Sequence, residues 1–495
     1  MSNKRIILLL LLALSIPAAL QLYNLTATAL WHDEAFSALL IQYDIKEMIY
    51  RIGLDVHPPL YYLLLKGWAA FFGNSLLVLR LFSVFFGVIT VLAVYAFVKE
   101  AFQSRKLAFF SSALLAFSSF QIQYAMEARM YTLGTFLTVV SSYFLLRALK
   151  LKHWLWWFFY ALAVSAGIYS HYFVIFWVIA QGIFIIYWLF KEAKFNFIEW
   201  LKNKNFQLAL TAYLFTIISF LPWLNIFLKQ TRQVQESYWI PPMNIWSIPA
   251  TVFKMTTGEG IDVSRYWYLL FFLMTIALAL VVYFLKKTKT SAKWLIFLLL
   301  TIPFLAVSAL SLKTSVYIDR YFIFSLPFYL ILMAGAVLVI RNKWAKNILV
   351  VLAILSSLIA FPIRWTNLNV EKKPGMAEAA SYLNQQVKPG DKIYVGSSFV
   401  YFTFKYYNQT GIHPKLYIPG SLPHFSGTAL LSPEDTIKDF YQGIKKGDII
   451  WMINTTGFGN YQPSLPNNWV KIDEKGTQDV HDYRGWIVVT KYQVQ

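Results

Sequence analysis

Long apolar runs separated by short basic loops constrain this chain more than any other feature. Each run is long enough for a helix to cross a bilayer, which takes about 20 mainly apolar residues. Hydrophobic residues make up 58% of the 495 positions and charged residues only 14%, a balance unlike that of a soluble core. The runs cover residues 6–23, 76–98, 107–124, 131–149, 154–171, 172–190, 206–228, 266–285, 294–312, 321–340 and 347–365. The sequence therefore predicts a polytopic all-α membrane protein with about eleven transmembrane helices.

The distribution of Lys and Arg tests this topology, because loops on the inner side of a membrane carry most of the positive charge. Every second loop is basic: the clusters lie at 99–106, 147–152, 191–204, 286–293 and 341–346. The formal net charge of +20 comes largely from these clusters, so it indicates topology rather than binding of nucleic acid. The N-terminus is then inside, and everything after Trp365 is exported.

The alternation holds only if the apolar segment Pro58–Phe72 does not cross. This segment is short of the roughly 20 residues of a crossing and would leave Lys66 near the bilayer centre. We therefore predict a juxtamembrane or re-entrant helix here. The first run, which follows Lys4 and Arg5, could be either a membrane helix or a signal peptide. It is longer than the roughly 7–15 residues of a signal h-region, which favours a retained helix, and both alternatives export the loop that follows.

Composition changes after Trp365, where apolar runs give way to mixed patterns. Met376–Gln386 has the pattern of a helix, and Lys392–Gly396, Ile449–Ile453 and Trp486–Tyr492 have the pattern of strands. We predict two domains: a transmembrane domain over residues 1–369 and a small external α/β domain over residues 370–495.

Polar residues concentrate in the loops that this topology exports. The first loop, residues 31–62, carries five acids and, before its Pro-Pro pair, the imidazole of His57. Together with the acid, arginines and histidine of later outer loops, the candidates are Asp33, Glu34, Asp44, Glu47, Asp55, His57, Glu127, Arg129, His171 and Arg320. Ionisable groups beside a membrane are costly and indicate function. A carboxylate there can take a proton from an acceptor hydroxyl, while Arg, Lys or His stabilises a phosphate leaving group.

Each of these residues also has a purely structural interpretation. Asp33 and Glu34 suit the first turn of a helix, where the dipole favours acids. Arg129 and Arg320 suit interfacial anchors whose charged ends reach water. His57 before two prolines suits a loop, and spacing alone leaves these alternatives open.

The motifs in these loops follow an order that resembles one known group. In chain order they are Trp31-His32-Asp33-Glu34, His57-Pro58-Pro59-Leu60-Tyr61-Tyr62, Arg80-Leu81, Glu127-Ala128-Arg129-Met130-Tyr131, His171-Tyr172 and Arg320-Tyr321. The set resembles bacterial glycosyltransferase family 39, which is similar to the protein O-mannosyltransferases and the lipid A aminoarabinose transferases. The resemblance implies a GT-C fold, a helical bundle whose first external loop forms juxtamembrane helices.

The resemblance also implies roles for particular residues. Asp33 matches the catalytic acid, here a general base, and Glu34 is its neighbour. His57 stands where the aminoarabinose transferases have a lysine that touches the lipid phosphate, and Arg129 and Arg320 would bind the same phosphate. Glu127 is the acid of the second-loop motif. Some relatives bind a divalent metal, for which Asp55, His57 and His171 are the candidate ligands, and the metal stays open.

We therefore expect an inverting glycosyltransferase of the plasma membrane, with its active site on the extracytoplasmic side. The donor would be a sugar on undecaprenyl or dolichyl phosphate, and the acceptor a protein, lipid or glycan of the cell envelope, as in protein glycosylation or lipopolysaccharide modification. One alternative is a lipid or sugar flippase or transporter, whose ionisable residues should lie near the bilayer midplane. Another is an O-antigen ligase, which lacks the early Asp-Glu loop.

Overall fold

The computed structural model describes residues 25–193, 196–236, 239–258, 267–352, 375–461, 463–479 and 485–495, with the single residues 15, 18, 19, 21, 22 and 355. Contacts between Cα atoms divide the chain into two compact units. The helical unit comprises Met1–Tyr23, His57–Tyr61 and Arg80–Arg364. The sheet unit comprises Asn24–Val56, Tyr62–Leu79 and Trp365–Gln495, so most of the first polar loop groups with the C-terminal residues.

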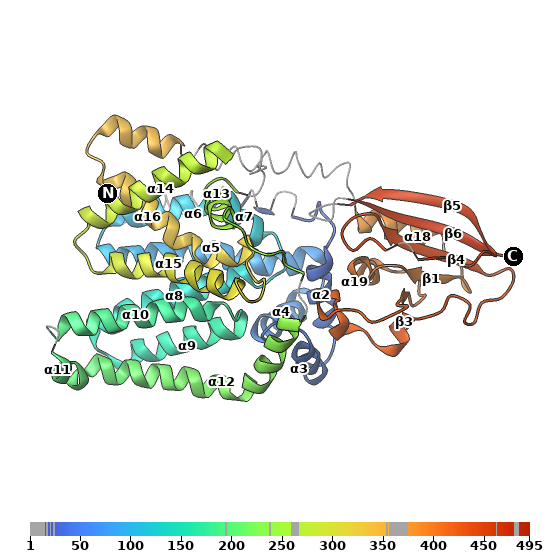
Figure 1. The fold of residues 1–495 in the computed structure, drawn as a ribbon, viewed down its shortest axis with the longest axis horizontal. Coiled ribbons are helices and arrows are strands. Elements are labelled where there is room, and N and C mark those ends of the chain that lie inside the picture. Colours follow the sequence, from blue (N-terminus) through green and yellow to red (C-terminus); the bar gives the residue numbers. More distant parts are fainter. Residues whose placement is uncertain are drawn as a thin grey trace. The chain divides into compact units, whose positions relative to one another are not determined.

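The helical unit is a bundle of apolar helices (Figure 1). Within the described ranges its elements are α5 (Leu76–Phe102), α6 (Arg105–Ala116), α7 (Ser119–Ala125), α8 (Tyr131–Leu151), α9 (Trp154–Ser170), α10 (Val174–Glu192), α11 (Phe197–Lys202), α12 (Lys204–Glu236), α13 (Ser247–Thr257), α14 (Trp267–Lys287), α15 (Ala292–Ser311), the 3-10 helix η2 (Asp319–Phe324) and α16 (Leu326–Val339). Among the described residues, α5, α8, α10, α12 and α15 are long and apolar enough to cross a membrane.

The predicted membrane-protein fold class is confirmed, but two of the predicted crossings are not single helices. The run 107–124 forms α6 and α7, because the Ser118 hydroxyl accepts a hydrogen bond from the Gln121 N–H (3.4 Å) and starts a new helix. The run 321–340 begins as η2 and continues as α16. The runs 6–23 and 347–365 lie largely outside the described residues.

A glycine on α8 brings η2 close to that helix. A Cβ on Gly134 would lie 2.6 Å from Cε1 of Phe324, so any side chain there would displace the ring. Phe324 is fully buried and also packs edge-on against Trp177, with ring centroids 5.2 Å apart. This packing holds the segment that carries Arg320 against the bundle.

The sheet unit combines the helices of the first loop with an α/β fold. Its elements are α2 (His32–Leu40), α3 (Ile45–Leu54), α4 (Leu60–Phe72), α18 (Met376–Gln386), β1 (Lys392–Val395), α19 (Ser398–Tyr407), β2 (Lys415–Tyr417), η4 (His424–Ser426), η5 (Thr428–Leu430), η6 (Pro433–Asp435), β3 (Thr436–Ile437), β4 (Ile449–Thr455), β5 (Trp469–Gln478) and β6 (Trp486–Val494). The strands follow the order β3-β2-β1-β4-β6-β5. The first four are parallel, whereas β6 runs antiparallel to both β4 and β5 (Figure 1).

The helix and three strands predicted for the C-terminal region are confirmed as α18, β1, β4 and β6. The sequence did not predict β5, because it is an exposed edge strand with few buried apolar side chains. It also missed α19 and the two short strands β2 and β3. The predicted domain boundary near residue 369 lies outside the described residues.

The predicted short helix at Pro58–Phe72 is confirmed as α4, which has 13 residues. Lys66, its one charged residue, lies in the middle of the helix, and its Nζ donates hydrogen bonds to the carbonyl oxygens of Ile41 (2.8 Å) and Tyr43 (2.7 Å). These two residues directly follow α2. The ammonium is thus satisfied by backbone within the sheet unit, and it joins α4 to the end of α2.

Candidate active site

The two adjacent acids of the first loop differ in their surroundings. Glu34 is fully buried, and its Oε2 accepts a hydrogen bond from the N–H of Trp31 (3.4 Å), the residue that precedes α2. This carboxylate therefore takes the helix-capping role that the first turn offers. Asp33 is only half-buried, so its carboxylate is the more accessible of the two.

In the helical unit, Arg129 and His57 form a basic pair. Arg129 is 2% exposed, and its Nη2 lies 3.3 Å from Nε2 of His57. A guanidinium has no acceptor, so it donates, and His57 Nε2 must present its lone pair. The Arg129 carbonyl accepts a hydrogen bond from the Ser83 hydroxyl (3.2 Å), and the Arg129 N–H donates to the Glu127 carbonyl (2.7 Å). The protein thus encloses Arg129 and holds its backbone in place.

A chain of hydrogen bonds from α12 holds the backbone of His57. Gln230, 1% exposed, donates through Nε2 to the His57 carbonyl (3.4 Å). Its Oε1 accepts from the Tyr172 hydroxyl, whose oxygen accepts from Nε1 of Trp223 (2.7 Å). Sequence reasoning missed Gln230 and Trp223. The one available signal is that Gln230 follows an apolar run on the outer side, as the other predicted site residues do.

His171 lies beside this pair. It is buried, 6% exposed, and interacts electrostatically with His57 and Arg129. Its ring packs against Tyr321 and Phe324, with centroids 5.1 Å away in each case. His171 therefore links the basic pair to η2.

Arg320, also on η2, lies with Cζ 5.3 Å above the Trp239 ring. The preceding residue, Asp319, forms an ion pair with Lys254 and accepts a hydrogen bond from the Thr251 hydroxyl (2.7 Å). These contacts fasten η2 to α13. Arg320, the residue after Asp319, therefore lies on a segment that α13 holds in place.

The predicted site residues are divided between the two units. His57, Glu127, Arg129, His171 and Arg320 belong to the helical unit. Asp33, Glu34 and Asp55 belong to the sheet unit. Across the described ranges, no three His, Asp or Glu side chains are grouped as a metal site requires.

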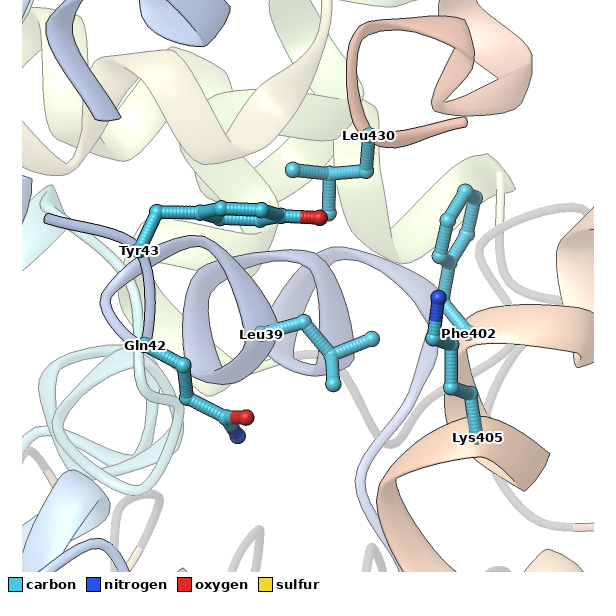
Figure 2. Close-up of a pocket in the computed structure, with 6 residues that line it drawn as sticks. All are labelled: Leu39, Gln42, Tyr43, Phe402, Lys405 and Leu430. Carbon is cyan, nitrogen blue, oxygen red and sulfur yellow. The ribbon is translucent and has the colours of Figure 1, made fainter. Parts of the chain in front are cut away.

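The sheet unit contains a pocket of about 240 Å³ (Figure 2). On one side lie residues from the end of α2, and on the other residues of α19 and η5; the six are Leu39, Gln42, Tyr43, Phe402, Lys405 and Leu430. Lys405 forms an ion pair with the buried Asp435, so this carboxylate compensates the charge at the pocket. No residue predicted for the active site lines it.

Residues 56–223 match the family model described as "Dolichyl-phosphate-mannose-protein mannosyltransferase". ArnT from Cupriavidus metallidurans has a similar fold. Its structure bound to undecaprenyl phosphate aligns with a TM-score of 0.63 at 12% identity, over 99% of this chain and 98% of that one. Its apo structure aligns with a TM-score of 0.62 at 12% identity, over 97% of each chain. The apo structure of the Archaeoglobus fulgidus oligosaccharyltransferase aligns with a TM-score of 0.51 at 12% identity, over 83% of this chain and 64% of that one. No curated protein matches by sequence.

These similarities agree with one another about the architecture. The expected GT-C fold is confirmed, because the chain has an ArnT-like fold and the alignment with ArnT covers nearly the whole of each chain. The matched family segment includes His57, Glu127, Arg129 and His171. Asp33 and Arg320 lie outside it.

Proposed function

We propose that this chain, which has the fold of the GT-C glycosyltransferases, transfers a sugar from a polyprenyl-phosphate carrier to an acceptor hydroxyl on the external face of the plasma membrane. The observation that carries the proposal is the enclosed pair of Arg129 and His57. A guanidinium can bind two oxygens of one phosphate at once. The similar fold of ArnT, whose structure contains undecaprenyl phosphate, supports a carrier of this class.

The pair also accounts for the histidine at position 57. A neutral imidazole binds phosphate less firmly than an ammonium. With Arg129 at 3.3 Å, the positive charge comes from the guanidinium, while His57 orients it through Nε2. Arg320 would add a second cation for the same phosphate.

The proposed reaction is a single inverting displacement. The acceptor oxygen forms a bond to the anomeric carbon while the bond from that carbon to the phosphate oxygen breaks. The bonding electrons leave with the polyprenyl phosphate, whose charge the arginines stabilise. The acceptor proton passes to the carboxylate of Asp33, the accessible acid of the pair. Glu34, which is buried and caps α2, would orient that helix.

The proposal is tested in two steps. Purified protein should bind undecaprenyl phosphate, measured by native mass spectrometry, and Arg129→Ala should weaken that binding. In cells, deletion of the gene should remove a sugar-bearing species from the envelope glycoconjugates analysed by mass spectrometry. Wild-type protein should restore that species, and Asp33→Asn should not. An envelope that is identical with and without the gene would contradict transfer and favour the transporter alternative.

A further inference from the structure

We propose that the C-terminal α/β domain is a positioning element of the active site: it sets the place of α2, the helix that carries Asp33, through Tyr407 and the rings of Phe399 and Phe402. This inference rests on the proposed function for the role of Asp33. It gives the C-terminal domain a task in catalysis that neither its sequence nor its fold indicates.

The first contact lies just before α2 begins. The N–H of Leu30 donates a hydrogen bond to the hydroxyl of Tyr407, 377 residues later in the chain, at 3.0 Å. Leu30 is 2% exposed, so this N–H would be buried without a partner if the hydroxyl were absent. Tyr407 is the last residue of α19, and this bond therefore ties the start of α2 to the C-terminal domain.

The second contact is made by His32, the residue before Asp33. Its ring is 5% exposed and lies 5.1 Å from the ring of Phe399 and 5.6 Å from that of Phe402, centroid to centroid. One turn of α19 thus packs against the first residue of α2. Because His32 and Asp33 are adjacent, any movement of the His32 ring is passed directly to the backbone of Asp33.

The two phenylalanine rings are themselves held in place. A Cβ on Gly459 would lie 2.2 Å from Phe399, and a Cβ on Gly427 would lie 2.3 Å from Phe402. Both glycines also have positive φ angles, 72° and 78°, which favour glycine independently of the space. The rings are therefore packed against backbone on one side and against His32 on the other.

The segment after α2 is tied to the same domain. Arg51 on α3 donates through Nη1 to the carbonyl of Ala429 (3.1 Å), and its Cζ lies 4.3 Å above the Tyr43 ring. Between these two attachments α2 borders the pocket of Figure 2, where Leu39 lies across from Phe402. The C-terminal domain thus contacts the first loop at the start of α2 and again beyond its end. Between these contacts, the pocket separates α2 from α19 and η5.

This arrangement has a catalytic consequence. A misplacement of about 1 Å in a reacting group can reduce a rate on the order of 100-fold. A general base on a short helix needs support from outside that helix, because nine residues are too few to hold their position alone. Here α19 supplies that support.

Two single-hydroxyl variants on α19 separate positioning from general stability. Tyr407→Phe removes the partner of Leu30, whereas Tyr406→Phe removes a hydroxyl that donates to the Asn74 carbonyl (3.1 Å), beyond α4. In hydrogen exchange followed by mass spectrometry, Tyr407→Phe should speed exchange in peptides covering residues 25–40 by about 2–10-fold. Tyr406→Phe should leave these peptides unchanged.

Activity and lipid binding complete the test. Tyr407→Phe should lower the envelope glycoconjugate signal while binding of undecaprenyl phosphate by the purified protein stays normal. His32→Ala should behave in the same way, and His32→Phe should recover most of the signal because it restores the ring contacts. Equal exchange of residues 25–40 in both tyrosine variants would overturn the proposal, and so would faster exchange with full transfer. Failure of the proposed function would appear separately, as an envelope that is identical with and without the gene, and failure of the role of Asp33 as normal transfer by Asp33→Asn.

Discussion

Nη2 of Arg129 lies 3.3 Å from Nε2 of His57, although 72 residues separate them in the chain. The contact joins the loop before α8 to the residue that precedes the Pro-Pro pair before α4. The guanidinium can donate hydrogen bonds to two phosphate oxygens in one plane, and the imidazole of His57 lies where it can orient that guanidinium through Nε2. Together they provide a preoriented cation.

Arg129→Ala should weaken binding of undecaprenyl phosphate by about 10–100-fold, because a hydrogen bond to a charged group contributes roughly 1.5–3 kcal/mol. Lysine should restore only part of the affinity, since it cannot contact two phosphate oxygens in one plane. Arg320→Ala should show a smaller loss. The matched control is Arg147→Ala, which removes a guanidinium paired with Glu100. Binding measured by native mass spectrometry that is unchanged in both Arg129→Ala and Arg320→Ala would reassign these residues as structural anchors.

Asp33→Asn should fold, bind the lipid phosphate and lose about 10²–10⁴-fold in transfer, the usual contribution of a positioned base. Glu34→Gln should be milder, because a glutamine oxygen can still accept the hydrogen bond from Trp31 that caps α2. If Asp33 only favoured the helix start, asparagine would serve nearly as well and the variant would be almost silent. Transfer by purified, verified-folded variants distinguishes the two cases, and near-normal turnover by Asp33→Asn would end its assignment as the base.

Gln230→Leu should loosen the backbone of His57 and reduce lipid-phosphate affinity by about 2–10-fold, as expected for loss of one or two neutral hydrogen bonds. The matched control is Gln207→Leu, an exposed glutamine on the same helix. Tyr172→Phe removes the hydroxyl that donates to Gln230 and should give a loss in the same direction. If Gln230→Leu and Gln207→Leu bind undecaprenyl phosphate equally well, the hydrogen-bond chain has no part in positioning His57.

Gln495 and the C-terminal domain should be outside the cell, and Lys287 should be in the cytoplasm, because the basic loops alternate along the chain. Single cysteines introduced at these positions can be tested, since the chain has no native cysteine. A membrane-impermeant maleimide applied to intact cells should label position 495 and not position 287. Labelling of position 287 alone would reverse the topology and place the proposed site on the wrong side.

Asp435→Asn should destabilise the C-terminal domain by about 2–3 kcal/mol. That is less than the ~3–5 kcal/mol of a fully buried ion pair, because Lys405 is 25% exposed. Burial raises the pKa of Asp435, but hydrogen bonds from Lys405, Tyr401 and Ser432 outweigh it and hold the pKa well below the usual value of 3.8. A carboxyl whose pKa is lower in the folded than in the unfolded protein stabilises the folded state at pH values above the unfolded pKa. This contribution is lost progressively as the pH falls below about 4.

The free energy of unfolding, measured in denaturant, should therefore fall between pH 4 and pH 2 in the wild type, with a weaker fall in Asp435→Asn. Asp439→Asn, at an exposed position three residues after β3 begins, is the control and should behave as the wild type. Identical pH profiles for wild type and Asp435→Asn would contradict the assigned role of this carboxylate.

The sequence by itself determined the elements whose signals are local. Apolar runs identified the membrane helices, the length of Pro58–Phe72 and its Lys66 predicted a short helix, and alternating patterns located β1, β4 and β6. The order of the motifs predicted the GT-C fold. The signals for these helices and strands each lie within about 20 consecutive residues, so neighbouring side chains carry them without reference to the rest of the chain. The order of the motifs, in contrast, is read along residues 31–321.

Only the tertiary structure decided which distant residues meet. The bond from Gln230 to the His57 carbonyl and the contact of Leu30 with Tyr407 join distant segments through single hydrogen bonds. A hydroxyl or amide has many eligible partners in a sequence of this length, and its choice depends on which backbone groups packing leaves buried and unsatisfied. That choice exists only once the helices have packed, because until then water satisfies every one of those groups.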